Sequence, residues 1–416
     1  MVAFRSGCDT ESVTMSAGSG TPRHGRGSPP SSRGSPPSNG TGGTAGNPAQ
    51  ASLFLLEPIA DAAMTYFYGQ LFAMDSEIRA MFPAAMDVQR KRFFRALVRI
   101  ARDQDDPAVL GPYLEQLGRA HRKYGVREQH YGMFRRALLA TLHRFAAQGW
   151  DETTQRTWER AFDHAVDVMI DAAERDAKQA PAWWIGTVTA TEPRGPDIAV
   201  LTVAPEQPLS YRPGQHVSVQ TPHWPRLWRR YSIANAPRPD GTIRLHVRAI
   251  AGGLVSPALV HHVRPGDPLV LGAPEGTMTA NTDSPRDVLC LAGGTGLAPV
   301  KAVIEAIIHA PAPGRRREVV LYFGARRHQD LYDLAELQQM ELAYPWLQVI
   351  PAVSDEPTRE DAMYGTVPEL AAKATWADRD IYVSGPDAMI VKTVQVLRER
   401  GAPGHLIRYD RGGLGD

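Results

Sequence analysis

The amino-acid sequence predicts a multidomain protein in which an all-α domain precedes an antiparallel β-barrel and a parallel α/β domain. Three patterns support this prediction. Apolar residues recur at helical spacing after the N-terminal segment, short alternating strands separated by Pro, Gly and Asp turns follow, and buried-type strands then alternate with helical stretches. With 416 residues and 43% hydrophobic content, the chain is long enough to form several cores.

The composition argues against several classes of protein. A formal net charge of +1 does not favour nucleic acid or a membrane surface as the main partner. The apolar runs are too short to cross a bilayer, so no membrane span is expected. Cys8 and Cys290 are the only cysteines, which excludes a disulfide framework and the four thiolates of a ferredoxin-type iron–sulfur cluster.

Residues 1–50 consist mainly of Gly, Ser, Pro and Arg and have almost no apolar side chains to bury. We expect this segment to be a disordered tail. It also lacks the continuous apolar stretch of a secretion signal, so we expect a cytoplasmic protein.

Residues 51–180 have the apolar periodicity of several amphipathic helices, with few strand signals. One of these helices, "LEQLGRAHRKYGV", carries Leu114, Leu117 and His121 on its apolar side and should end where Gly125 adopts the left-handed cap. A lone histidine on such a side is more often a core residue than a ligand. The rest of the chain has to decide between these two roles.

Residues 181–285 contain the alternating strands "WWIGTVTATE", "IAVLTVAP", "HVSVQT", "RRYSIANAP" and "TIRLHVRAI", which are typical of a small barrel. On the fourth strand Arg229 and Tyr231 point to one face and Ser232 to the other. A cation beside an aromatic ring suits a ligand that has both a phosphate and a flat ring.

A second segment of this domain, "VRAIAGGLVSPAL", places Gly252 and Gly253 shortly before Ser256, where a helix is expected to start. Backbone amides exposed by glycine at such a position could hold a pyrophosphate.

Residues 286–416 contain the buried-type strands "DVLCLAGG", "EVVLYFGA", "LQVIPAV" and "DIYVSGP" with helical patterns between them, as expected for a parallel sheet. The glycine cluster 293–296 stands between a strand and a helix, the context required for a dinucleotide phosphate site. Gly385 and Pro386 close another strand at its carboxyl end, where open α/β sheets bind ligands.

Together, these four segments resemble the ferredoxin–NADP reductase superfamily, in which a barrel binds FAD and an α/β domain binds NAD(P)H. The resemblance implies that FAD is bound by Arg229, Tyr231, Ser232, Gly252, Gly253 and Ser256. It also implies that the nicotinamide nucleotide is bound by Gly294, Thr295, Gly296, Pro299, Ser384, Gly385 and Pro386.

The sequence departs from the superfamily pattern in two places. Ser384 replaces a cysteine that is common beside the nicotinamide, and about Gly412 many members have an aromatic residue over the flavin. For the coenzyme, Arg326 and Arg327 could bind a 2′-phosphate, whereas the Asp-Leu-Tyr sequence that follows resembles NADH-using reductases. NADH is favoured, and NADPH stays open.

The helical region resembles the globin domain of flavohaemoglobins, which also have the order globin, FAD barrel and NAD domain. This resemblance makes His121 the proximal ligand of haem b and Tyr131 its hydrogen-bonding partner. It places Tyr68 and Gln89 as distal polar groups and Phe82 against the haem face. A haem would provide the one-electron acceptor that the flavin needs.

The globin region also departs from the family pattern. Phe93 stands where an aliphatic residue is usual, and Ala173 stands where the family has a glutamate that hydrogen-bonds to the tyrosine and the proximal histidine. Glu174 is one residue further, about 100° around the helix. The proximal triad is therefore incomplete unless the helix rotates.

The resemblance implies a nitric oxide dioxygenase: electrons pass from NADH through FAD to haem, and NO and O2 become nitrate without an obligatory protein partner. Two alternatives stay open. The reductase could serve an external acceptor with a regulatory globin, or the globin could sense oxygen or redox state with the tail as its interaction arm.

Overall fold

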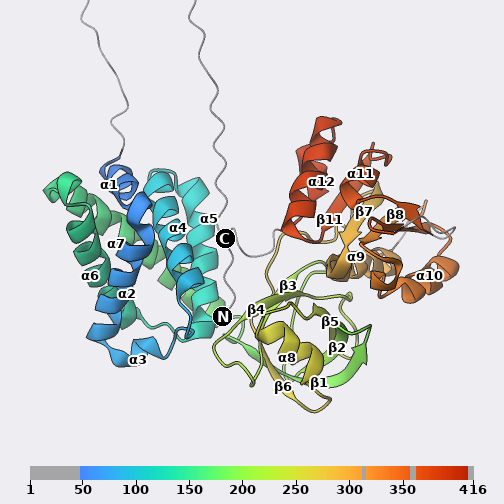
Figure 1. Cartoon of the computed structure of the whole chain (residues 1–416), viewed down its shortest axis with the longest axis horizontal. Coiled ribbons are helices and arrows are strands. Elements are labelled where there is room, and N and C mark those ends of the chain that lie inside the picture. The colour runs from blue at the N-terminus through green and yellow to red at the C-terminus, as the bar shows by residue number, and fades with distance from the viewer. Residues whose placement is uncertain (1–46, 312–314, 357–361, 411–416) are drawn as a thin grey trace, which may run out of the picture. The chain divides into compact units, whose positions relative to one another are not determined.

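The computed structural model describes residues 47–311, 315–356 and 362–410 (Figure 1). The predicted disordered tail falls almost entirely outside these residues. Its last few residues differ from the expectation, because a helix already begins at Pro48. Asn47 caps this helix by accepting a hydrogen bond from the Ala49 N–H at 2.9 Å.

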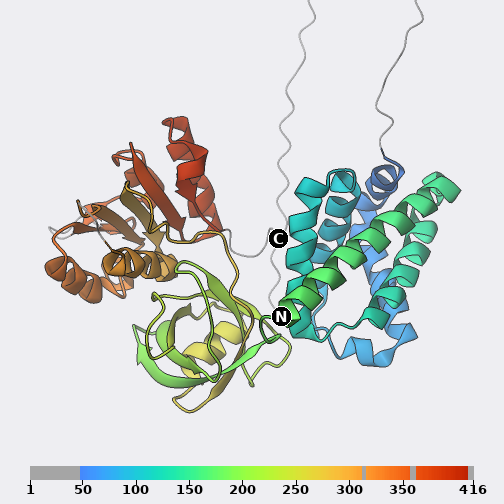
Figure 2. The same ribbon diagram turned by 180° about the vertical axis from the view of Figure 1, so that it is seen from behind.

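The first domain consists of helices, as predicted. They are α1 (Pro48–Leu56), α2 (Ala60–Met74), α3 (Ser76–Arg79), α4 (Asp87–Asp103), α5 (Pro107–His121), α6 (Glu128–Phe145) and α7 (Glu152–Ala177). Short 3-10 turns join some of them, and the turn that follows α5 ends at Gly125, whose φ of 70° is the expected left-handed cap. Figure 2 shows the molecule from behind, and in this view α7, in green, runs across the front of the other helices of this domain.

Two contacts fix α7 within this domain. The indole N–H of Trp158, which is fully buried, donates to the Ser52 hydroxyl of α1 at 2.8 Å. At the other contact, α7 and α5 touch through their backbones: a Cβ added to Gly118 would lie 2.2 Å from the carbonyl oxygen of Met169. Glycine is therefore required at position 118, one turn before His121.

The second domain is a nearly closed antiparallel barrel, as predicted. Its strands are β1 (Trp184–Pro193), β2 (Ile198–Pro205), β3 (His216–Gln220), β4 (Arg229–Ser232), β5 (Ile243–Arg248) and β6 (Pro268–Leu271). They pair in the order β4-β3-β6-β1-β2-β5, and a bridge between Ile233 and Leu245 brings the two edges together. Helix α8 (Val255–His261) follows the segment that contains Gly252 and Gly253.

The third domain is a parallel sheet with helices on both faces. Its strands are β7 (Asp287–Gly293), β8 (Val319–Ala325), β9 (Leu347–Val353), β10 (Met363–Tyr364), β11 (Arg379–Ser384) and β12 (Ile407–Arg408), in the order β10-β9-β8-β7-β11-β12. The helices are α9 (Leu297–His309), α10 (Leu334–Ala343), α11 (Val367–Ala371) and α12 (Asp387–Glu399). Alternate residues of β7 pack into opposite cores, Cys290 toward α9 and Leu291 toward α11 and α12.

Among the described residues, no helix combines the length and the apolar character needed to cross a membrane.

Candidate functional site

His121, the residue predicted to be the proximal ligand, is the last residue of α5. Its Nδ1 lies 2.6 Å from the Leu117 carbonyl oxygen. Because a carbonyl only accepts hydrogen bonds, Nδ1 carries the proton and Nε2 keeps its lone pair. Nε2 makes no hydrogen bond to any described residue. Burial lowers the pKa of His121, which favours the neutral imidazole that binds a metal.

Tyr68, one of the predicted distal residues, lies on α2 and is only 3% exposed. Its hydroxyl has no hydrogen-bond partner among the residues that the structure describes, and an unpartnered buried hydroxyl is costly. Burial raises the pKa of Tyr68, and the nearby Gln89 side chain and Arg90 charge offset this rise only in part. The phenol is therefore protonated and can donate to a bound ligand.

Aromatic rings surround Tyr68. Its ring centroid lies 5.4 Å from that of Phe82 and 6.0 Å from that of Phe93. The structure thus places Phe82 and Gln89, two of the predicted site residues, near Tyr68. A cluster of aromatic rings around one hydroxyl without a partner among the described residues, in a domain that also presents an imidazole nitrogen without a hydrogen bond to any described residue, fits haem.

The expected hydrogen bond between Tyr131 and His121 is not present among the described residues. Tyr131 is half-buried and packs beside Leu117 and Met169, and it also lines a groove of about 620 Å³ between α6 and α7. Ala173 is half-buried, and Glu174 is exposed.

In the barrel, β4 carries the predicted flavin residues. Arg229 is exposed and, among the described residues, donates only to the adjacent Trp228 carbonyl, at 2.9 Å, so its charge is available for a phosphate. Burial raises the pKa of Tyr231, which keeps the phenol neutral on the same face of the strand. Ser232 points to the other face, as β-strand geometry requires.

The predicted pyrophosphate segment forms a tight turn. Gly252 has a φ of 74°, which disfavours a side chain, and a Cβ on Gly253 would lie 3.0 Å from the Ile250 carbonyl oxygen. The Ser256 hydroxyl accepts a hydrogen bond from the Ile250 N–H at 3.2 Å and so closes the turn. The backbone at the two glycines can therefore be approached closely by a ligand.

The two predicted nucleotide segments of the third domain touch each other. A Cβ on Gly296 would lie 2.5 Å from the backbone N and Cα of Gly385. Because β7 and β11 are adjacent parallel strands, both segments stand at the same carboxyl edge of the sheet. The nearby cofactor residues predicted from sequence are Thr295 and Pro299 after β7, and Ser384 and Pro386 at the end of β11.

Two contacts made by residues of the barrel were not identified from the sequence. Asp410, the last described residue, accepts hydrogen bonds from the Thr277 backbone N–H at 2.9 Å and hydroxyl at 2.8 Å, whereas position 412 lies outside the described residues. Lys123, two residues after His121, donates to the Ser218 hydroxyl of β3 at 2.9 Å. Partners so distant in sequence leave no local signal.

Comparisons with known proteins agree with the three domains. Residues 65–169 match the globin family, residues 187–279 the oxidoreductase FAD-binding domain, and residues 290–395 the oxidoreductase NAD-binding domain.

Among similar proteins, the xylene/toluene monooxygenase electron transfer component of Pseudomonas putida is 33% identical over 52% of this chain, and the match spans 61% of that relative's length. The flavohemoprotein of Halalkalibacterium halodurans is 23% identical over 87% of this chain and 94% of its own length.

The same fold occurs in the flavohemoglobin of Malassezia yamatoensis, solved with bound FAD and heme. The TM-score is 0.71 at 15% identity, and the match covers 88% of this chain and 99% of that one. The chain is therefore a fusion of a globin domain with FAD-binding and NAD-binding oxidoreductase domains, in the order found in flavohaemoproteins.

Proposed function

We propose that this protein is a nitric oxide dioxygenase that uses NADH, in preference to NADPH, to convert NO and O2 into nitrate. Two NO and two O2 consume one hydride equivalent and give two nitrate ions. When bound, FAD converts hydride into single electrons and haem iron provides the oxygen-binding centre. The observation that carries the proposal is the buried Tyr68 hydroxyl, which has no partner in the described part of the chain, together with the FAD-binding and NAD-binding domains of the same chain.

Each side of the globin site has a distinct task in this proposal. His121 provides Nε2 as the iron ligand, and its bond to Leu117 holds the ring in one tautomer. Tyr68, assisted by Gln89, would hold a hydrogen-bond donor on the side of the site where haem would bind oxygen, and a donor there favours negative charge. Phe82 and Phe93 exclude water from this side.

One contact supports electron delivery within the chain. Lys123 follows the proximal helix and donates to Ser218 of the barrel at 2.9 Å, so the segment after His121 is tied to the domain that carries the flavin residues. An electron acceptor in the globin domain of the same chain would not require the flavin domain to bind a separate acceptor protein.

A second candidate is a reductase for an external acceptor. The 33% identity of 52% of this chain to an electron transfer component favours it. The two candidates differ in the product: the first consumes NO and forms nitrate, and the second reduces an added acceptor whether or not haem is present.

The test uses the full chain loaded with haem and FAD. His121→Ala should lose the Soret band and NADH-dependent NO consumption while it keeps FAD and ferricyanide reduction. Tyr68→Phe should keep haem but consume NO about tenfold to a hundredfold more slowly, because a hydrogen bond to a charged group contributes about 1.5–3 kcal/mol.

Tyr66→Phe is the matched control, because Tyr66 lies on the same helix and packs against Phe145 rather than the Phe82 side. It should behave like the wild type. Wild-type protein that reduces ferricyanide but forms no nitrate from NO would contradict the dioxygenase and favour the second candidate.

A further inference from the structure

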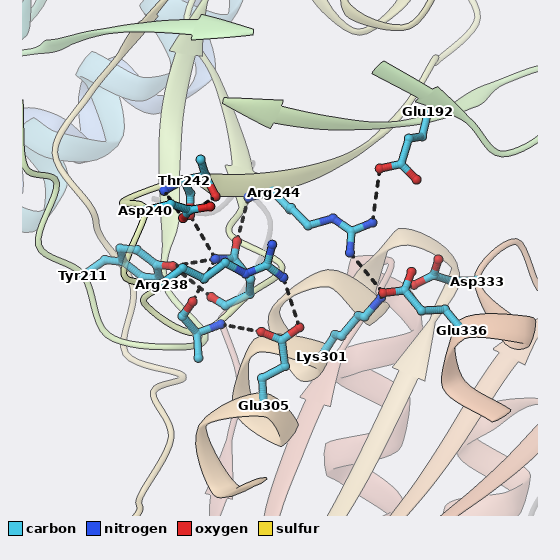
Figure 3. Close-up of polar contacts among 12 residues, drawn as sticks. Glu192, Tyr211, Arg238, Asp240, Thr242, Arg244, Lys301, Glu305, Asp333 and Glu336 are labelled. Atoms are coloured by element: carbon cyan, nitrogen blue, oxygen red, sulfur yellow. Dashed lines mark hydrogen bonds and ion pairs between the residues drawn. The ribbon is translucent and has the colours of Figure 1, made fainter. Parts of the chain in front are cut away.

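Lys301 is the starting observation, since its side chain is only 1% exposed within an otherwise apolar helix. It lies on α9, just over one turn after the glycine cluster 293–296. Its ammonium contacts Asp333 and Glu336, each at 2.7 Å. A buried ammonium is costly unless it is paired, so this arrangement needs both carboxylates. Figure 3 shows Lys301 pointing toward Asp333 and Glu336.

The same carboxylates reach across to the barrel. Arg244 of β5 donates to the Glu336 carboxylate at 3.0 Å, and Arg194, after β1, lies 3.4 Å from Asp333. Glu192 of β1 pairs with both arginines, at 2.8 Å to Arg194 and 3.6 Å to Arg244.

The charges of the two sides are complementary. The α/β domain contributes one cation and two anions, whereas the barrel contributes two cations and one anion. Glu336 joins the two sets, since one of its oxygens contacts both Lys301 and Arg244. We refer to these six residues as the interdomain network: Lys301, Asp333, Glu336, Arg194, Arg244 and Glu192.

A second connection starts one turn further along α9. Glu305 accepts a hydrogen bond from the Ala236 backbone N–H at 2.9 Å and lies 3.6 Å from Arg238 (Figure 3). Ala236 belongs to "RRYSIANAP", the segment whose first residues form the flavin-binding strand β4. Helix α9 is thus attached directly to the flavin segment.

The loop that contains Ala236 is itself fixed by hydrogen bonds of the neighbouring Asn235. Asn235 is fully buried and donates to the Ala236 carbonyl at 2.8 Å and the Thr242 carbonyl at 3.1 Å. Its side-chain amide oxygen Oδ1 accepts from the Arg244 backbone N–H at 2.6 Å. Asn235 therefore links the Glu305 contact to the strand that carries Arg244.

We propose that the interdomain network and Glu305 position the nicotinamide-binding glycine cluster against the flavin-binding strand, so that they set the rate of hydride transfer from NADH to FAD. None of these residues is placed in contact with either cofactor, so they are positioning residues. Reacting atoms must approach to about 3–3.5 Å, and a displacement of about 1 Å costs up to about a hundredfold in rate. This inference rests on the reductase half of the proposed function and not on NO oxidation.

The variants are Glu336→Gln, Arg244→Gln and Glu305→Ala in the full chain with haem and FAD. Glu305→Gln is the conservative partner, because its amide oxygen can still accept from Ala236. Arg286→Gln is the control, since Arg286 pairs with Asp378 at 3.1 Å within the α/β domain. Anaerobic stopped-flow absorbance gives the flavin reduction rate per bound FAD, and long-wavelength absorbance reports the NADH–flavin charge-transfer complex.

We expect the first three variants to lower the limiting flavin reduction rate about tenfold or more and to weaken the charge-transfer absorbance. Their Kd for NADH should stay within about twofold of the wild type, because the glycine cluster itself is intact. Glu305→Gln should recover most of the rate, and Arg286→Gln should not change it.

Two results would overturn the inference. One is an unchanged limiting rate in the three variants. The other is a loss of rate without loss of charge-transfer absorbance, or an equal loss in Glu305→Gln, since either result points to a role other than positioning. Wild-type protein that reduces its flavin normally but forms no nitrate would refute the dioxygenase proposal and leave this inference intact.

Discussion

Replacing Gly118 by alanine should loosen the proximal side of the globin domain. Position 118 is buried in α5 where it crosses α7, and an added Cβ would meet the Met169 carbonyl oxygen at 2.2 Å and its Cα at 2.7 Å. Because these are backbone atoms, the rotation of a side chain cannot relieve the clash. Since real Cβ contacts essentially never fall below 3.0 Å, the helices must separate by at least about 0.8 Å.

The expected magnitude follows from two opposing effects. Overpacking of a close-packed site costs about 1–3 kcal/mol, whereas alanine gains about 1 kcal/mol over glycine in a helix interior. Gly69→Ala isolates the second effect, because Gly69 lies within α2 and nothing surrounds its added Cβ within 4 Å. The two variants should therefore differ by about 1–3 kcal/mol in the free energy of unfolding.

The assay is urea unfolding of the haem-loaded protein, followed by the Soret band and by circular dichroism at 222 nm. The Soret band reports the globin domain alone, which avoids treating a multidomain chain as one transition. Gly118→Ala should shift the Soret midpoint to lower urea and release haem faster, and Gly69→Ala should shift it to higher urea. Equal stabilisation by both substitutions would refute the argument that α5 and α7 are in backbone contact.

Two further predictions concern titratable groups of the α/β domain. Burial raises the pKa of the Cys290 thiol to about 12, so in a Cys8→Ser protein a thiol reagent at pH 8 should label nothing until urea is added. Although burial would raise the pKa of Glu336, Lys301 and Arg244 lower it to about 2, below its usual 4.5. Its contribution to stability is therefore complete above pH 4.5 and lost as pH falls toward 2. The difference in unfolding free energy between wild type and Glu336→Gln, measured in urea, should shrink from pH 5 to pH 3, and a constant difference would contradict the assignment.

Most of the fold could be predicted because each domain repeats one hydrophobic pattern. The four main strands of the parallel sheet are largely apolar runs, and barrel strands such as β1 and β5 alternate between polar and apolar residues. The short strands β10 and β12 contain two residues each and leave no periodicity to detect. The helix start at Pro48 was missed because the boundary was drawn from composition rather than from the cap at Asn47.

The residues of the candidate site also fall into two groups: some belong to a local sequence pattern, and others have partners that are distant in the sequence. Glycine clusters and the "RRYS" strand are local patterns, so the sequence identified them. The interdomain network was missed because Arg244 and Glu336 are 92 residues apart. One signal was nevertheless present: in "LAPVKAVIEAII" the only charged residues are Lys301 and Glu305, four apart on an otherwise apolar helix. Charges placed there require partners from another part of the chain.

The position of α7 bears on the proximal triad. Glu174 could approach His121 only if α7 rotated by about 100°. Trp158 is bonded to Ser52, the Met169 backbone rests against Gly118, and Asp176 pairs with Arg122 at the end of the helix. A rotation would break all three contacts, so Glu174 stays in solvent.

The consequence for His121, the proposed proximal ligand, is an imidazole without a carboxylate partner among the described residues. His121 donates its Nδ1 proton to the neutral Leu117 carbonyl, which makes the ring less electron-donating than one that is hydrogen-bonded to a carboxylate. Within the proposed function, charge on the oxygen ligand then has to be stabilised mainly from the distal side, by the Tyr68 hydroxyl and Gln89. Substitution of Tyr68 should consequently cost more in NO turnover than substitution of Tyr131, which makes no hydrogen bond to His121 among the described residues.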